Sequence, residues 1–305
     1  MFIHLIEKYK INQIIYSEEP MFSIKKNLTL FLISLMLVMS TQSYASNTDA
    51  SIKIIKSSLS SFQLYIGNYY LVKNHYYSKK YYLLSAENGN SEAQTTVGDL
   101  YIKGELFATD YKKAMKWLMK ASESNNPKAQ AYIGYLYSQG LGVEKNYDNA
   151  LKWYLKSAKQ DFGLAQNNIG SLYYDGNGVQ QDYQAAMEWY QKAAKNGYAK
   201  SENNIAYLYQ HGLGVDIDYK KAMEWYLKSA SKNDAGAMYN IGYLYEKGLG
   251  VPVDIEKAKE WYDKAYSLGL DIARFRLNLL KIKTQNKHDS WIIFNMIFIE
   301  IKMIT

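Results

Sequence analysis

One pentapeptide recurs every 36 residues and constrains the fold more than any other feature. It reads VGDLY at 97–101, IGYLY at 133–137, IGSLY at 169–173, IAYLY at 205–209 and IGYLY at 241–245. Five tryptophans keep the same period: Trp117, Trp153, Trp189, Trp225 and Trp261. Self-similarity at this period predicts a solenoid of stacked units rather than one globular core. Five full units span residues 91–270.

The sequence of each 36-residue unit predicts two helices. In the first, Ala129, Ile133 and Leu136 fall on one helical face, and a G-x-G-V turn such as GLGV at 140–143 follows. The second helix begins at a short polar residue that can cap its free N–H groups, namely Asp110, Asn146, Asp182, Asp218 or Asp254. It ends at a residue that tolerates a left-handed conformation: Gly89, Asn125, Asp161, Gly197, Asn233 or Gly269.

The array has flanking segments. Residues 55–90 predict one more helix pair with a shorter turn, in which Tyr81 stands at the tryptophan position. Residues 271–287, with Ala273, Leu277 and Leu280, predict a lone capping helix. The apolar tail 288–305 is interpreted as an amphipathic capping element, with a membrane-surface contact and a sequence artefact as the alternatives.

The N-terminal sequence predicts export. Residues 25–45 read KKNLTLFLISLMLVMSTQSYA, which has the basic, apolar and small-x-small regions of a secretory signal peptide. The apolar stretch is too short to serve as a stable transmembrane anchor. We therefore expect a signal peptide at 21–45, cleaved after Ala45, a linker at 46–54 and a periplasmic or secreted product. Residues 1–20 are interpreted as an upstream extension before the true start.

Composition excludes several kinds of site. The chain carries 36 Lys and Arg against 29 Asp and Glu, without a long block of one sign, which argues against a nucleic-acid partner. It contains no cysteine, so disulfides, thiol nucleophiles, Fe–S clusters and cysteine-type zinc sites are excluded. Its four histidines are scattered through the sequence. We expect no metal site and no cofactor.

The recurring residues have structural interpretations. The G-x-G-V turns lack the Gly-Lys-Ser/Thr of a phosphate-binding loop. One Asp per unit suits a helix cap better than an acid–base pair. The tryptophans are assigned to the core between repeats rather than to a stacking platform. Packing roles are therefore predicted for the five tryptophans, for the caps Asp110, Asp182, Asp218 and Asp254, and for the pentapeptide glycines Gly98, Gly134, Gly170 and Gly242. No catalytic residue is predicted.

These motifs identify a family resemblance. A 36-residue unit with A-x-x-x-[IV]-G-x-L-Y, G-x-G-V-x-x-D-Y and A-x-x-W-Y resembles the Sel1-like repeat (SLR), a relative of the tetratricopeptide repeat, and the leading pair is closer to the tetratricopeptide form. The resemblance implies an all-α fold, an α-solenoid forming a right-handed superhelix of helix-turn-helix repeats. It also implies adaptor and assembly roles, including those of exported bacterial proteins.

The variable positions point to the function. In tetratricopeptide-type solenoids the first helices line the concave wall, and positions that differ between units are free to bind. The candidate contact residues at these positions are Tyr135, Asn167, Tyr174, Asn203, Tyr207, Gln210, Tyr239, Tyr243 and Glu246. Tyrosine with amide side chains suits an extended peptide or a carbohydrate.

We therefore expect an exported, non-enzymatic scaffold that holds a partner polypeptide. Two alternatives stay open. One is a glycan- or peptidoglycan-binding repeat protein, which the same tyrosines would suit. The other is a cell-envelope hydrolase of the β-lactamase-like type, which the resemblance to cysteine-rich relatives suggests but for which the sequence offers no nucleophile.

Overall fold

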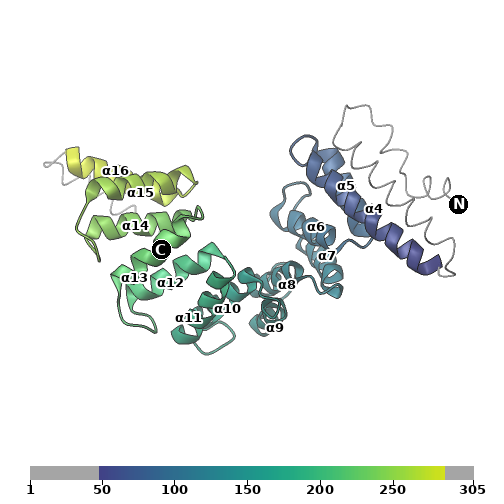
Figure 1. Cartoon of the computed structure of the whole chain (residues 1–305), viewed down its shortest axis with the longest axis horizontal. Helices are drawn as coiled ribbons and strands as arrows, with labels where there is room; N and C mark the ends of the chain where they lie inside the picture. The colour runs from purple at the N-terminus through teal and green to yellow at the C-terminus, as the bar shows by residue number, and fades with distance from the viewer. Residues whose placement is uncertain (1–47, 286–305) are drawn as a thin grey trace. The chain divides into compact units, whose positions relative to one another are not determined.

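The computed structural model describes residues 48–285, which form thirteen helices and no strand (Figure 1). In chain order these are α4 (Thr48–Tyr70), α5 (His75–Glu87), α6 (Ser91–Lys103), α7 (Tyr111–Glu123), α8 (Pro127–Gln139), α9 (Tyr147–Ala158), α10 (Gly163–Asp175), α11 (Tyr183–Lys195), α12 (Ala199–His211), α13 (Tyr219–Ala230), α14 (Ala235–Lys247), α15 (Ile255–Ser267) and α16 (Asp271–Gln285). The predicted all-α solenoid of helix pairs is confirmed. The expected signal peptide at 21–45 and the tail at 288–305 lie outside the described residues.

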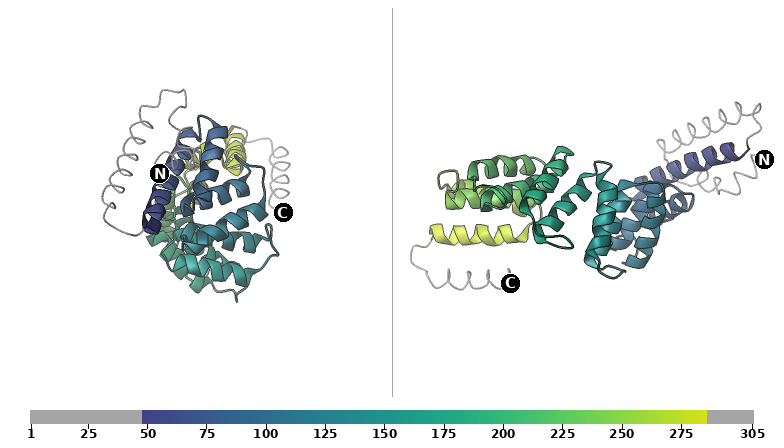
Figure 2. Two further views of the ribbon diagram at one scale, coloured as in Figure 1. Left: turned by 90° about the vertical axis from the view of Figure 1, so that its right-hand side faces the viewer. Right: turned by 90° about the horizontal axis from the view of Figure 1, so that it is seen from below.

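The chain divides into two compact units. Among the described residues, the first comprises 48–136 with 140–144, and the second comprises 137–139 with 145–285. Within the second unit, every helix from α9 to α15 packs against the next one in the chain (Figure 2). Within the first, α4 to α7 pack in the same sequential way. Each helix therefore finds its neighbours locally, as in a solenoid.

Helix caps set the boundaries of the second helices. The Asp182 carboxylate accepts hydrogen bonds from the backbone N–H groups of Gln184 and Ala185, both at 2.9 Å. Each of the other second helices of the repeats has the same device at its first turn, provided by Asp110, Asn146, Asp218 and Asp254. The φ angles are positive at all six predicted helix-ending positions: Gly89, Asn125, Asp161, Gly197, Asn233 and Gly269.

The G-x-G-V turn holds adjacent pairs together. At the second glycine of one such turn, Gly178, φ is +69° and an added Cβ would lie 2.5 Å from the Cβ of Tyr147. Tyr147 begins the second helix of the preceding pair, so the bare glycine allows the turn to lie directly on it. These glycines therefore serve packing within the array, not phosphate binding.

The predicted tryptophans pack against the core but are not its most deeply buried aromatic residues. Trp189 and its four counterparts, Trp117, Trp153, Trp225 and Trp261, are only partly buried. Each ring is covered by the lysine three residues later, with Nζ between 4.0 and 4.5 Å from the ring centroid. The next residue is the buried one: Leu118, Tyr154, Tyr190, Tyr226 and Tyr262 are all 3% exposed or less.

The pentapeptide glycine explains why this neighbouring residue is buried. A Cβ added at Gly170 would lie 2.6 Å from two ring carbons of Tyr190, and one added at Gly242 would lie 2.8 Å from Tyr262. The glycine thus lets the second-helix tyrosine pack directly on the first-helix backbone. In the first repeat Gly98 contacts Leu118 in the same way. A tyrosine thus packs on the glycine in the pairs α10/α11 and α14/α15, whereas Ala206 holds the glycine position in α12/α13.

The edges of the array also differ from expectation. Residues 48–54, assigned to a linker from the sequence, form the first turns of α4. At the other end, the expected lone helix is present as α16.

Candidate functional site

Eight of the nine predicted contact residues lie in the second unit, on the first helices of three consecutive pairs. These helices are α10, α12 and α14. Only Tyr135 lies in the first unit, on α8, where 39% of the residue is exposed. The first-helix surface of the second unit, defined by the other eight residues, is therefore the candidate site.

Two of the eight residues belong to a ladder of amide hydrogen bonds between successive first helices. Asn204 Nδ2 donates to Asn167 Oδ1 over 3.0 Å, joining α12 to α10. Asn240 Nδ2 donates to Asn203 Oδ1 over 3.1 Å, joining α14 to α12. Asn167 is also buried, at 7% exposed. The ladder fixes the spacing of the first helices, and its donors, Asn204 and Asn240, were not among the predicted site residues.

Two more have side chains that bond to the buried tyrosines. The Tyr226 hydroxyl donates to Gln210 Oε1 at 2.8 Å, and the Tyr262 hydroxyl donates to Glu246 Oε2 at 2.9 Å. Burial raises the pKa of both hydroxyls well above the usual value. Gln210 and Glu246 therefore satisfy donors of the core, and their polar groups are used inside the array.

Glu246 also forms the most buried ion pair of the second unit. Arg276 of α16 donates from Nε to Glu246 Oε2 at 2.9 Å and from Nη2 to Oε1 at 3.2 Å. Burial acts to raise the pKa of Glu246, but Arg276, Lys247 and the Tyr262 hydroxyl together lower it below the usual value. This two-point contact attaches the capping helix to the last repeat.

Of the eight predicted residues of the second unit, the four tyrosines are left to contact a partner. Tyr207 is 38% exposed, whereas Tyr174, Tyr239 and Tyr243 are partly buried. The Tyr239 ring lies 5.2 Å from that of Tyr262. The Tyr243 ring faces the protein's own cations, with Lys247 Nζ 5.8 Å and Arg276 Cζ 5.9 Å from its centroid.

A pocket of about 270 Å³ opens beside Tyr207. It is lined by Ser171, Tyr174, Asp175, Tyr190, Asn204 and Tyr207, which come from α10, α11 and α12. The rings of Tyr174 and Tyr207 stand edge to face, 6.3 Å apart at 70°. Burial, aided by the neighbouring Tyr207, raises the pKa of Tyr174 to about 12. Burial also raises the pKa of Tyr190 to about 12 and raises that of Asp175.

His211 supports one wall of this pocket. Its ring centroid lies 4.1 Å from that of Tyr207, and its Nε2 lies 3.2 Å from Gln210 Nε2. Burial lowers the pKa of His211, which favours the neutral imidazole at physiological pH. The carboxylate of Asp175 is thus the charged group of the pocket lining. Sequence analysis missed Asp175 because its position was not among those assigned to the concave wall, although the residue there also varies between repeats.

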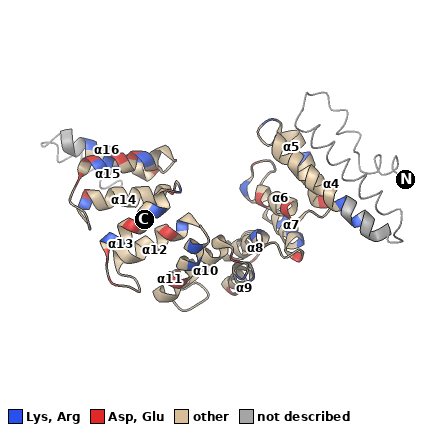
Figure 3. Cartoon of the chain, in the orientation of Figure 1, with Lys and Arg blue, Asp and Glu red and all other residues tan. Residues whose placement is uncertain are grey.

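Within residues 48–285, no group of three His, Asp or Glu side chains is arranged to hold a metal ion. In the same range no helix combines the length and the apolar character needed to cross a bilayer. Basic and acidic residues are interspersed over the helices (Figure 3). The four capping aspartates are spread over four different repeats, and three of them pair with the lysine three residues later.

Solved structures of known proteins share this fold. A Sel1 repeat protein from Oxalobacter formigenes is 31% identical, with a TM-score of 0.64 over 78% of this chain and 98% of that protein. A protective antigen from uropathogenic Escherichia coli with an SLR fold is 28% identical, with a TM-score of 0.60 over 84% of this chain. The match covers only 53% of that antigen. An immunity protein from Pseudomonas aeruginosa shares the fold at 20% identity, with a TM-score of 0.53 over 70% of this chain and 82% of that one.

Curated proteins gave no match. The family model for the Sel1 repeat, in contrast, matches six consecutive segments: 64–90, 91–126, 127–162, 163–198, 199–234 and 235–270. The first of these falls in the short-turn pair formed by α4 and α5. Together the six segments cover most of the described array, and the chain belongs to the Sel1 repeat family.

Proposed function

We propose that this protein is an exported, non-enzymatic scaffold that binds a partner polypeptide on the first-helix surface of its second unit. The observation that carries the proposal is the exposure of Tyr207 beside the pocket, on a surface whose other polar side chains are bonded internally. A tyrosine exposed next to a pocket has the character of an interface anchor, because its ring offers a large contact area at a low cost in side-chain entropy.

The family supports a scaffold role, since a solenoid exposes a long surface of side chains that vary from repeat to repeat. Export is supported by the sequence at 21–45. An intact mass beginning at Ser46, measured on protein recovered outside the cytoplasm, is the expected result. A product that retains Leu28 to Met39 would contradict the export proposal.

Partner binding is tested by capture from the cell envelope and medium, followed by quantitative binding of the captured protein. Replacing Tyr207 and Tyr243 together by alanine should weaken that binding by about 2 kcal/mol or more, as expected for aromatic anchors. The helical circular-dichroism spectrum should hardly change.

The matched control is Leu227→Ala, which removes an exposed apolar side chain from the second helix α13, where Leu227 is 44% exposed. Full affinity in the double tyrosine variant would contradict the proposal. Retention on isolated peptidoglycan instead of a protein would favour the glycan-binding alternative.

A further inference from the structure

The pocket beside Tyr207 has a counterpart two repeats later. Adding 72 to each residue number relates Asn204 to Arg276, Tyr190 to Tyr262, and Tyr174 to Glu246. In both places the buried tyrosine of the second helix forms the floor, and the next first helix supplies one side. The same architecture therefore occurs with two different sets of side chains.

At the later position the protein fills this space with its own guanidinium. Arg276 bonds to both carboxylate oxygens of Glu246 and lies 5.9 Å from the Tyr243 ring centroid, and its side chain is only 15% exposed. The fold can therefore bury an arginine head group at this point, between a carboxylate and an aromatic ring.

At the earlier position the space is open. Asn204 replaces the arginine, and its amide turns aside to Asn167 at 3.0 Å. The resulting pocket of about 270 Å³ is of a size for one long side chain rather than for a drug-sized ligand.

The lining of the open pocket matches a cation. The rings of Tyr174 and Tyr207 offer the aromatic walls that attract Arg and Lys head groups. Asp175 supplies the negative charge, and among the ion pairs of residues 48–285 none involves it. In the other full repeats this position holds Lys103, Gln139, His211 or Lys247, so a carboxylate is particular to α10.

We propose that this pocket receives an arginine side chain of the partner polypeptide, with its guanidinium beside the Asp175 carboxylate and against the aromatic surface that Tyr174 and Tyr207 form together. The proposal rests on the proposed function and adds the chemistry of the anchor. The carboxylate comes from Asp175, one residue after the position that Glu246 holds two repeats later and that Tyr174 holds here.

The test uses small probes and the full chain. N-acetyl-arginine methylamide is titrated while the ring signals of labelled tyrosines are followed by NMR, and the neutral analogue N-acetyl-citrulline methylamide serves as the comparison. The arginine probe should shift the Tyr174 and Tyr207 signals saturably, with an affinity about fivefold or more above that of the citrulline probe. Equal affinities for the two probes would overturn the proposal, as would tighter binding of N-acetyl-lysine methylamide.

Two variants make the test specific. Asp175→Asn should weaken the arginine probe about fivefold and leave the citrulline probe unchanged, whereas Asp148→Asn, at an exposed aspartate of α9, should change neither. Asn204→Arg should place an internal guanidinium in the pocket, as at Arg276, and abolish probe binding while the helical spectrum is retained. Undiminished probe binding in Asn204→Arg would locate the probe elsewhere and overturn the proposal.

The outcomes separate this inference from the proposed function. If Tyr207→Ala abolishes binding of the captured partner but neither probe binds the wild-type chain, the arginine pocket is wrong and the scaffold function stands. If the arginine probe binds as described but the tyrosine variants keep full affinity for the partner, the pocket stands and the proposed partner surface is wrong.

Discussion

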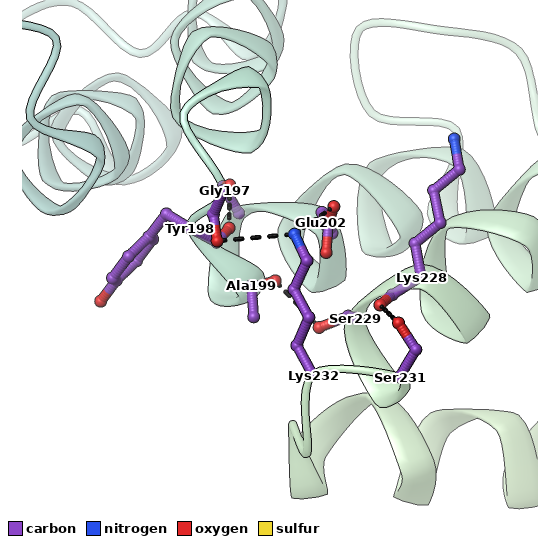
Figure 4. Close-up of polar contacts among 9 residues, drawn as sticks. Gly197, Tyr198, Ala199, Glu202, Lys228, Ser229, Ser231 and Lys232 are labelled. Carbon is purple, nitrogen blue, oxygen red and sulfur yellow. Dashed lines mark hydrogen bonds and ion pairs between the residues drawn. The ribbon is translucent and has the colours of Figure 1, made fainter.

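Lys232 Nζ lies 2.9 Å from Glu202 Oε1, and it also approaches the Gly197 carbonyl at 3.5 Å (Figure 4). One repeat earlier the same two positions hold Asn196 and Gln166, whose amides bond over 2.9 Å. In both repeats the contact joins a residue just after the second helix to a residue in the first turn of the first helix of the same pair. An ion pair and an amide pair thus occupy the same place in adjacent repeats.

The ion pair is incompletely satisfied. Glu202 is 6% exposed, and its Oε2 is buried without a hydrogen-bond partner among the described residues. In the glutamine repeats, the corresponding amide nitrogen donates to a carbonyl of the preceding helix, as Gln94 does to Ala86 at 3.0 Å. A carboxylate has no proton to donate there, which leaves a buried acceptor unpaired.

Glu202→Gln should therefore stabilise the protein by about 1 kcal/mol, because the new amide can donate to the carbonyl and its oxygen can still accept from Lys232. The reverse change, Gln166→Glu, should destabilise by about 2 kcal/mol, because it buries a carboxylate beside acceptors. Urea denaturation of the two variants measures both effects. Changes of the same sign would contradict this explanation of the site.

A second prediction concerns the aromatic core. Tyr190→Ala should destabilise by about 3–5 kcal/mol, since a fully packed ring is lost from the glycine contact at Gly170. Trp189→Ala should cost about 2 kcal/mol, because that ring is only partly buried under Lys192. Equal midpoints in urea for the two variants, at equal m-values, would show that the core assignment is wrong.

Sequence periodicity predicted the helix pairs, the aspartate caps and the left-handed helix ends, because each depends on residues within one or two turns of one another. It placed the tryptophans in the core between repeats but did not reveal that the neighbouring tyrosine is buried more deeply. Trp189 and Tyr190 recur with nearly equal regularity, and the close approach of Gly170, twenty residues earlier, to the Tyr190 ring is a contact between two helices that periodicity does not reveal. Sequence periodicity also did not reveal that Gln210 and Glu246 bond to core tyrosines, because those contacts depend on how two helices pack.

A third prediction follows from the glycine contact. Gly170→Ala would place a Cβ 2.6 Å from the Tyr190 ring and 3.2 Å from the Ala186 carbonyl. The overpacking should outweigh the gain in helix propensity and destabilise by about 1–2 kcal/mol. Gly236→Ala is the matched control, because the nearest atom to its Cβ would be the Asp234 carboxylate at 3.2 Å, at the open start of α14. Thermal melts should show a lower midpoint for the first variant only.

The last prediction concerns the Arg276–Glu246 pair in acid. Because Arg276 and its neighbours lower the pKa of Glu246 in the folded state, the ionised carboxylate stabilises the fold above its unfolded pKa. That contribution is lost as the pH falls through the lowered folded value. Arg276→Met should cost about 2–3 kcal/mol at pH 7, since it leaves a largely buried carboxylate with Lys247 as its remaining cation.

Below about pH 4 the cost of Arg276→Met should shrink, because protonation neutralises Glu246 in the variant at a higher pH than in the wild type. Arg274→Met is the control, since Arg274 lies on the same helix but is exposed and covers the Tyr266 ring. Its effect on the free energy of unfolding should be small at every pH. If the Arg276→Met penalty, measured by urea denaturation from pH 7 to pH 3, were constant, the pair would contribute through packing of the arginine stem and not through charge.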